Sequence, residues 1–327
     1  MKKIALLGIF TPEAVERFSA SCAGEYEVVH YSDPGDVALA TGASYVVLRG
    51  TPIGPEQMDI LGPDVQLYHR WGVGFDNVDV EEAGRRGIPV AITTGVNARC
   101  VAEMTMLLIL AAYRRLPQLM ECAKSGAAQS QKDAIAAEGR LLAGKRVGLV
   151  GVGNVGILVS QFARAFGAEV VYYDVRRLSP ETEREGIAYL PFDELVATSD
   201  IVSLHLPLFE STYHMFDLKT FEKMKPTALL VNTARGGIVD SNDLAEALRS
   251  GLIWGAALDT AEEEPMDPAH PLLHSDRVVV TPHVGGSSRD LADDMIRCIM
   301  DNIRLVERGE IPPARYLANR KYFYKDS

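Results

Sequence analysis

Residues 145–174 read KRVGLVGVGNVGILVSQFARAFGAEVVYYD, which is an apolar strand, a glycine-rich turn, a helix and a second apolar strand in succession. The turn carries the pattern G-x-G-x-x-G at Gly151, Gly153 and Gly156. The first glycine allows a tight turn, the second lets the backbone approach a pyrophosphate, and the third permits close helix–strand packing. The amino end of the helix offers unpaired N–H groups to that pyrophosphate. This segment therefore predicts a dinucleotide-binding unit on a parallel sheet.

Asp174 closes the second strand, about 20 residues beyond the glycine turn, where a carboxylate accepts hydrogen bonds from the adenosine ribose hydroxyls. A 2′-phosphate at that place would meet a negative charge, so the sequence favours NAD over NADP. Arg176 and Arg177 follow directly, and use of NADP stays open if one of them reaches the phosphate.

Short apolar runs alternate with helix-like segments on both sides of this unit, which is typical of βα units on parallel sheets. Strands are predicted at residues 4–7, 26–30, 45–48, 66–69 and 89–92, and at 146–150, 169–173, 201–205, 228–231, 255–258 and 278–281. The expected fold class is α/β with two Rossmann-like domains. One domain comprises residues 1–98 plus 288–327, and the other comprises residues 99–287 with the glycine turn.

Three further segments lie between or after these predicted strands. A long helix is expected to begin after Asn97, which is a good N-cap, to continue through the helix formers at residues 101–116, and to end at Pro117. It is apolar on most faces, so we expect it between the domains or in the interface of a homodimer. Residues 124–139 are polar and small, which is typical of a linker or of a loosely packed excursion. An amphipathic helix is expected from residue 288 to about residue 307.

The charge balance excludes several classes of partner. With 33 basic and 44 acidic residues, the net charge of -11 repels phosphate backbones and anionic lipids, so neither nucleic acid nor a membrane is expected. The longest apolar run, residues 104–112, is far shorter than the roughly 20 residues that a bilayer requires. The four cysteines are scattered without metal-ligand spacing, which predicts reduced thiols, no metal site and a cytoplasmic location.

Three polar side chains directly follow predicted strands of the second domain. Arg235 lies in VNTARGGIVD, Glu264 in LDTAEEEP and His283 in VVVTPHVGG. An arginine can hold a carboxylate through two hydrogen bonds, a histidine can exchange a proton near neutral pH, and a carboxylate can orient that histidine. Taken singly, Arg235 fits a surface loop, Glu264 fits a solvated acidic run and His283 fits a structural turn. Because strand ends are where ligands bind in open α/β sheets, their convergence predicts a site for hydride chemistry on a hydroxy acid.

The order GVGNVG, HLPL, NTARGGIVD, LDTAEEEP and TPHVGG resembles the D-isomer-specific 2-hydroxyacid dehydrogenase family, which includes phosphoglycerate, glyoxylate/hydroxypyruvate, formate and D-lactate dehydrogenases. RWGVGFDNVD (70–79) and VNARCVAE (96–103) extend the resemblance over nearly the whole chain. It implies a flavodoxin-like substrate domain beside the NAD domain, and hydride transfer between nicotinamide and C2 of a small 2-hydroxy or 2-oxo acid. By this resemblance Arg235 holds the substrate, His283 is the acid/base and Glu264 is its partner.

The resemblance also implies the lining of the site. Cofactor-binding residues would be Gly151, Gly153, Asn154, Val155, Gly156, Asp174, His205, Thr233, Ala234 and Asp259. Substrate-binding residues would be Arg235, the backbone N–H groups of Val73 and Gly74, and Arg49 as a second cation for a longer or phosphorylated acid. His205 equally fits a packing role, and Arg49 a surface position. Thr260-Ala261 replaces the usual aromatic residue, Phe209-Glu-Ser-Thr212 a proline-threonine run and Met104 a common histidine, which leaves the substrate open.

Other functions on this fold remain alternatives. Some members of the family act as NAD-sensing corepressors, in which the ligand state controls protein binding. An amino-acid dehydrogenase would need a lysine or aspartate in place of His283. A non-catalytic NAD-binding module would have no use for the Arg–Glu–His set.

Overall fold

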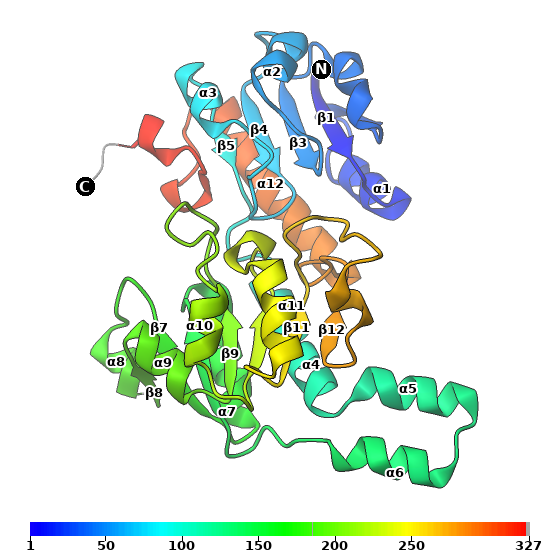
Figure 1. Ribbon diagram of the computed structural model, residues 1–327. Coiled ribbons are helices and arrows are strands. Elements are labelled where there is room, and N and C mark those ends of the chain that lie inside the picture. Colours follow the sequence, from blue (N-terminus) through cyan, green and yellow to red (C-terminus); the bar gives the residue numbers. More distant parts are fainter. Residues whose placement is uncertain (185, 325–327) are drawn as a thin grey trace. The chain divides into compact units, whose positions relative to one another are not determined.

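The computed structural model describes residues 1–184 and 186–324, and the chain divides into two compact units (Figure 1). Unit 1 comprises Met1–Asn97 and Ser288–Ser327, and unit 2 comprises Ala98–Ser287. Each unit is built on one parallel sheet, which confirms the predicted α/β class. Within the described residues, no helix has the length and apolarity needed to cross a membrane.

Unit 1 contains a five-stranded sheet in the order β2-β1-β3-β4-β5, which is the flavodoxin-like order. Its strands are β1 (Lys2–Gly8), β2 (Tyr26–Tyr31), β3 (Tyr45–Arg49), β4 (Leu67–Arg70) and β5 (Val90–Ala91). Alternate residues of each strand face opposite sides of the sheet, so two apolar layers form. Helices α1 (Pro12–Ser21) and α12 (Ala292–Glu307) cover one face, and η1 (Pro34–Ala40), α2 (Pro55–Leu61) and α3 (Val80–Arg85) cover the other.

Unit 2 contains a seven-stranded parallel sheet in the order β12-β11-β10-β9-β6-β7-β8. Its strands are β6 (Arg146–Val150), β7 (Glu169–Tyr173), β8 (Ile187–Tyr189), β9 (Ile201–Leu204), β10 (Leu229–Asn232), β11 (Gly255–Leu258) and β12 (Val278–Val280). The order reverses between β6 and β9, and such a switch point leaves a crevice at the carboxyl ends of the strands. The sequence did not predict β8.

Helices cover both faces of this second sheet. On one face lie α4 (Ala98–Tyr113) and α7 (Asn154–Ala165), and on the other lie α9 (Phe192–Thr198), α10 (Leu218–Lys223) and α11 (Ser241–Ser250). The remaining short elements are α8 (Pro180–Arg184), η2 (Gly236–Ile238), η3 (Pro271–His274), η4 (Arg289–Leu291), η5 (Ala314–Tyr316) and η6 (Arg320–Tyr322).

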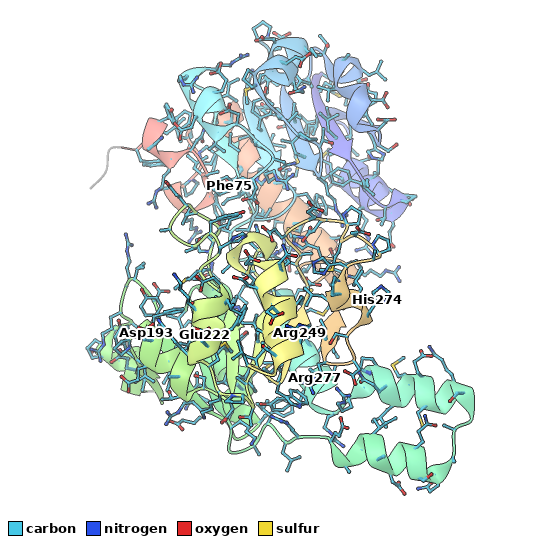
Figure 2. All side chains as sticks on the ribbon, viewed as in Figure 1. Phe75, Asp193, Glu222, Arg249, His274 and Arg277 are labelled. Carbon is cyan, nitrogen blue, oxygen red and sulfur yellow. The ribbon has the colours of Figure 1, made fainter. Side chains whose placement is uncertain are left out.

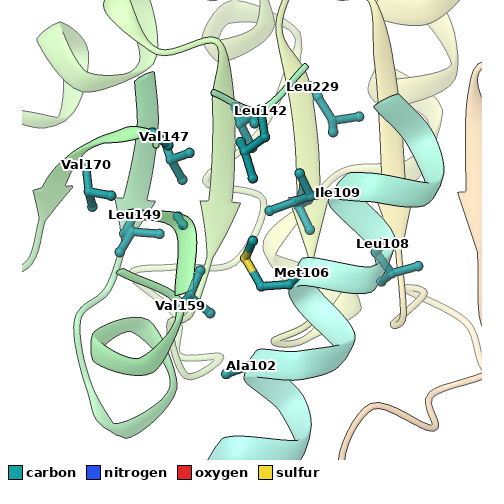
Figure 3. Packing of buried hydrophobic residues seen from close by; sticks show 14 of the residues in the cluster. Ala102, Met106, Leu108, Ile109, Leu142, Val147, Leu149, Val159, Val170 and Leu229 are labelled. Carbon is teal, nitrogen blue, oxygen red and sulfur yellow. The ribbon is translucent and has the colours of Figure 1, made fainter. Parts of the chain in front are cut away.

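Helix α4 is buried on more than one side, as its apolar sequence predicted. Met106 and Ile109 point toward the sheet, in one cluster with Leu149 of β6 and Val159 of α7 (Figure 3). Leu107 faces away and is 53% exposed. The helix therefore packs on the sheet of its own unit and leaves an apolar side chain uncovered.

The predicted end of this helix was wrong. Helix α4 ends at Tyr113, and Arg115 adopts a left-handed conformation with a φ of 52°. Pro117 stands in the first turn of the next helix, α5 (Leu116–Ser125), where its missing N–H costs no helical hydrogen bond. Pro117 therefore helps to begin a helix rather than only ending one.

Residues 124–139 are not a linker, and they fit the predicted alternative of a loosely packed excursion. The segment contains the end of α5 and all of a further helix, α6 (Gln129–Ala137), which lies beside α5 (Figure 1). No residue of either helix is buried. The sequence of α6 lacks the strong apolar stripe that marks buried helices, so its pattern did not predict a helix.

Candidate active site

The glycine turn between β6 and α7 has the geometry that its sequence predicts. Gly151 has a φ of 97°, and a Cβ there would lie 2.6 Å from the carbonyl oxygen of His205. A Cβ on Gly156 would lie 2.4 Å from the carbonyl oxygen of Gly151, so helix and strand approach closely. Gly153 caps α7 with no atom within 4 Å of its Cβ position, and no side chain caps the helix. This open helix end, which continues into Asn154 and Val155, fits a diphosphate.

Asp174 lies just beyond the end of β7, beside this turn. One of its carboxylate oxygens accepts a hydrogen bond from the N–H of Val152 at 2.9 Å, and the other accepts one from the N–H of Arg176 at 3.0 Å. These bonds fix the carboxylate next to the glycine turn. The guanidinium of Arg177 is bound to Glu183 at 2.7 Å, and Arg176 is exposed.

His205 lies at the switch point of the sheet, where β9 and β6 end side by side. The backbone N–H of His205 donates to the carbonyl of Val150 at 2.8 Å, and the ring Nε2 lies 3.0 Å from the hydroxyl of Ser203. Burial lowers the pKa of His205 to about 3, so its ring is neutral at any working pH. A neutral ring at this place can border a ribose through hydrogen bonds without adding charge.

The turn after β10 presents Arg235. The buried amide of Asn232 shapes this turn, because it accepts from the N–H of Ala234 at 3.0 Å and donates to the carbonyl of Arg235 at 2.9 Å. The hydroxyl of Thr233 bonds that of Thr105 in α4 at 2.8 Å. Sequence reasoning missed Asn232. Its position directly before the predicted residues was the available signal, since Asn side chains commonly bond backbone in turns.

His283 and Glu264 form an ion pair, as the sequence predicted from two separate motifs. The Nδ1 of His283 lies 2.7 Å from a carboxylate oxygen of Glu264, whose other oxygen accepts from the N–H of Ala261 at 3.1 Å. The bond from Glu264 raises the pKa of His283 above its ordinary value, while burial and the charge of Arg235 oppose it. Burial disfavours the charged form of Glu264, but its bonds to His283 and Ala261 outweigh this and lower its pKa.

Asp259, at the end of β11, holds the segment that carries His283. Its buried carboxylate accepts from the hydroxyl of Thr281 at 2.6 Å and from the N–H groups of Val284 at 3.0 Å and Gly285 at 2.7 Å. His283 itself has a φ of 53°, which is costly for a residue with a Cβ. The carboxylate therefore fixes a strained backbone, in addition to any contact with a cofactor.

In unit 1 the predicted substrate residues gather at the carboxyl ends of β3 and β4. Arg49 ends β3 at the switch point of this sheet, where Gly8 and Gly50 form a bridge. Burial lowers the pKa of Arg49. The loop of Val73 and Gly74 follows β4, and the side chain of Arg70 donates to the carbonyl of Gly74 at 2.7 Å. Each unit thus places its predicted residues at its own switch point or at neighbouring strand ends.

Comparisons with known proteins agree with this arrangement. Residues 106–285 match the family described as "D-isomer specific 2-hydroxyacid dehydrogenase, NAD binding domain". A glyoxylate reductase of Thermofilum pendens is 40% identical over 263 residues, which cover 80% of this chain and 77% of the relative. A glyoxylate reductase of Korarchaeum cryptofilum is 38% identical over 268 residues, covering 82% and 80%. The crystal structure of a putative D-isomer specific 2-hydroxyacid dehydrogenase from Polaromonas sp. JS6 66 covers 97% of this chain and 99% of its own, with a TM-score of 0.87 and 28% identity.

The fold and the paired strand-end residues define a nicotinamide-dependent oxidoreductase that acts on the CH–OH group of 2-hydroxy acids. The chain belongs to the D-isomer specific 2-hydroxyacid dehydrogenase family. The resemblance drawn from the sequence motifs is therefore confirmed, as is the reaction class that it implied.

Proposed function

We propose that this protein reduces glyoxylate or a closely related small 2-oxo acid with NADH. The observation that carries the proposal is the His283–Glu264 pair at 2.7 Å, because this pair can deliver a proton to a carbonyl oxygen. The similarity to proteins named glyoxylate reductase supports a small substrate. The reverse direction, oxidation of the hydroxy acid, uses the same groups.

Each residue has a distinct part in this proposal. NADH, when bound, supplies the hydride to C2 of the acid. Arg235 holds the substrate carboxylate and offsets the negative charge that develops on the carbonyl oxygen. His283 gives its proton to that oxygen, and Glu264 keeps the imidazole oriented and protonated until then. Asp259 keeps the backbone of His283 in place.

Each unit has binding residues of its own in this proposal. Unit 2 binds the cofactor through the glycine turn, Asn154 and Val155, with His205, Thr233, Ala234 and Asp259 lining the nicotinamide end. Unit 1 binds the substrate through the N–H groups of Val73 and Gly74. Arg49 would serve as a second cation if the acid were longer or phosphorylated.

We further propose that NAD is preferred over NADP. The carboxylate of Asp174 is fixed beside the glycine turn, where it can accept bonds from ribose hydroxyls and repel a 2′-phosphate. Arg176 and Arg177 are the two cations that could bind a 2′-phosphate. The ion pair between Arg177 and Glu183 supports the preference for NAD, because it already engages one of them.

We also propose a homodimer in the cytoplasm. Leu107 and Met120, from α4 and α5, are more than half exposed, and Leu116 is 41% exposed. Apolar side chains gathered on neighbouring helices favour cover by a second copy of the chain. The four cysteines are free thiols, which suits a reducing compartment.

The first experiment follows NADH, and separately NADPH, with a panel of 2-oxo acids that includes glyoxylate, hydroxypyruvate, pyruvate and phosphohydroxypyruvate. Turnover should require one of these acids and NADH, and His283→Ala should lower kcat by about 10²–10⁴-fold. Tight NADH binding without turnover of any acid would contradict the proposal and favour an NAD-sensing corepressor. Gel filtration of the same sample tests the dimer.

A further inference from the structure

His214 lies in the loop that follows β9, in a conformation that few residues adopt. Its φ is 48°, in the left-handed region. Side chains with a Cβ disfavour this region, and a non-glycine residue remains there only when its surroundings fix it. His214 is half-buried, so its ring has neighbours that could supply this restraint.

Both ring nitrogens of His214 contact carboxylates. Nε2 lies 2.6 Å from a carboxylate oxygen of Glu262, and Nδ1 lies 3.2 Å from a carboxylate oxygen of Asp240. Carboxylate oxygens only accept hydrogen bonds, so Nε2 is the donor in the bond to Glu262. Tyr213 stacks on the ring with a centroid distance of 3.9 Å, and its hydroxyl donates to Glu262 at 3.3 Å.

The carboxylate of Asp240 belongs to the segment that follows Arg235. The other oxygen of Asp240 caps α11 by accepting from the N–H of Asp243 at 3.0 Å. The backbone N–H of His214 donates to the carbonyl of Gly237 at 2.9 Å. His214 therefore contacts the Arg235 loop both through its ring and through its backbone.

The carboxylate of Glu262 belongs to the segment that carries Glu264. Glu262 directly follows Ala261, whose N–H holds Glu264. A Cβ on Gly236 would lie 1.8 Å from the carbonyl oxygen of Ala261, so the two loops touch directly beside Arg235. The ring of His214 spans this junction from one loop to the other.

We propose that His214 is a positioning residue whose ring joins the loop of Arg235 to the loop of Glu264, with Glu262 as the partner in the second loop. This inference rests on the proposed function for the roles of Arg235 and Glu264. It gives two of the three residues in the acidic run 262–264 separate roles. Glu264 pairs with His283, Glu262 holds His214, and Glu263 makes no hydrogen bond or ion pair with the residues that the structure describes.

Two variants test the proposal. His214→Asn keeps a residue that tolerates the left-handed backbone but cannot reach both carboxylates. Glu262→Gln removes the charge on the other side at nearly constant shape. Glu263→Gln is the matched control for the second variant, and His274→Gln, at an exposed position labelled in Figure 2, is the control for the first.

We expect both test variants to lower kcat by about 10–100-fold, because small displacements of reacting groups have effects of that size. NADH affinity and the controls should stay at wild-type values. The pKa of His283, followed by ring-proton NMR, should fall toward its ordinary value because Glu264 is held less firmly. Wild-type kcat and an unchanged His283 titration in both variants would overturn the proposal.

The design separates this inference from the proposed function. If the wild-type protein reduces no 2-oxo acid, the proposed function fails, yet the NMR titration of His283 still reports on the two loops. If His214→Asn does not fold, Glu262→Gln and its neighbouring control decide alone.

Discussion

At the scale of single residues, the pair of His283 and Glu264 sets the pH dependence of the reaction. Reduction needs a proton on His283, so the rate should fall as pH rises through its pKa, which Glu264 raises. In Glu264→Gln this fall should occur at lower pH, and kcat should decrease by about 10–100-fold. The pH profile of kcat/KM with NADH measures both effects. An unchanged pH profile of kcat/KM in Glu264→Gln would contradict the pairing of Glu264 with His283. Glu263→Gln is the control variant.

Sequence reasoning found some residues of this site and missed others for a physical reason. Arg235, Glu264 and His283 follow apolar strands, and strand ends of a parallel sheet converge, so order along the chain was enough to predict their meeting. The role of His214 depends on Glu262, which lies 48 residues further along the chain, and on a backbone conformation that no pattern specifies. Such contacts exist only once the loops have folded.

At the scale of elements, burial decided which predictions succeeded. Strands β6, β7 and β11 have the predicted bounds, and each is an apolar run with a neighbouring strand on both sides. Strand β8 has three residues at the sheet edge, and α6 has no buried residue, so neither carries a strong apolar pattern. Pattern recognition therefore described the core of each unit better than its periphery.

Helix α4 offers a direct test of packing at this scale. Ile109 is fully buried against the sheet, so Ile109→Ala should lower the free energy of unfolding by about 2–5 kcal/mol. Leu107→Ala, two residues earlier on the exposed side, should cost the monomer less than about 0.5 kcal/mol. Urea denaturation measures the difference. Equal losses would mean that α4 does not present the two faces described for it.

At the scale of the whole molecule, each unit holds one histidine ring kept neutral by burial at or just past the end of a central strand. His205 follows β9 in unit 2, and His69 lies in β4 of unit 1. The Nδ1 of His69 lies 2.9 Å from the carbonyl oxygen of Arg70, and its Nε2 lies 3.0 Å from the amide of Asn302 in α12. His69 is 1% exposed, so a proton on its ring would charge a buried position.

The buried neutral ring of His69 predicts a loss of stability in mild acid. Burial lowers the pKa of His69 to about 4, while in the unfolded chain it is about 6.5. Between these values the unfolded state binds more protons, so stability falls as pH falls, by roughly 3 kcal/mol from this group. His69→Gln cannot titrate there. At pH 7 the variant should be less stable than the wild type, because it loses bonds to Arg70 and Asn302. Toward pH 4 the difference in the free energy of unfolding between the two proteins should shrink by roughly 3 kcal/mol. Denaturation curves that stay parallel between pH 7 and pH 4 would show that His69 does not drive the acid response.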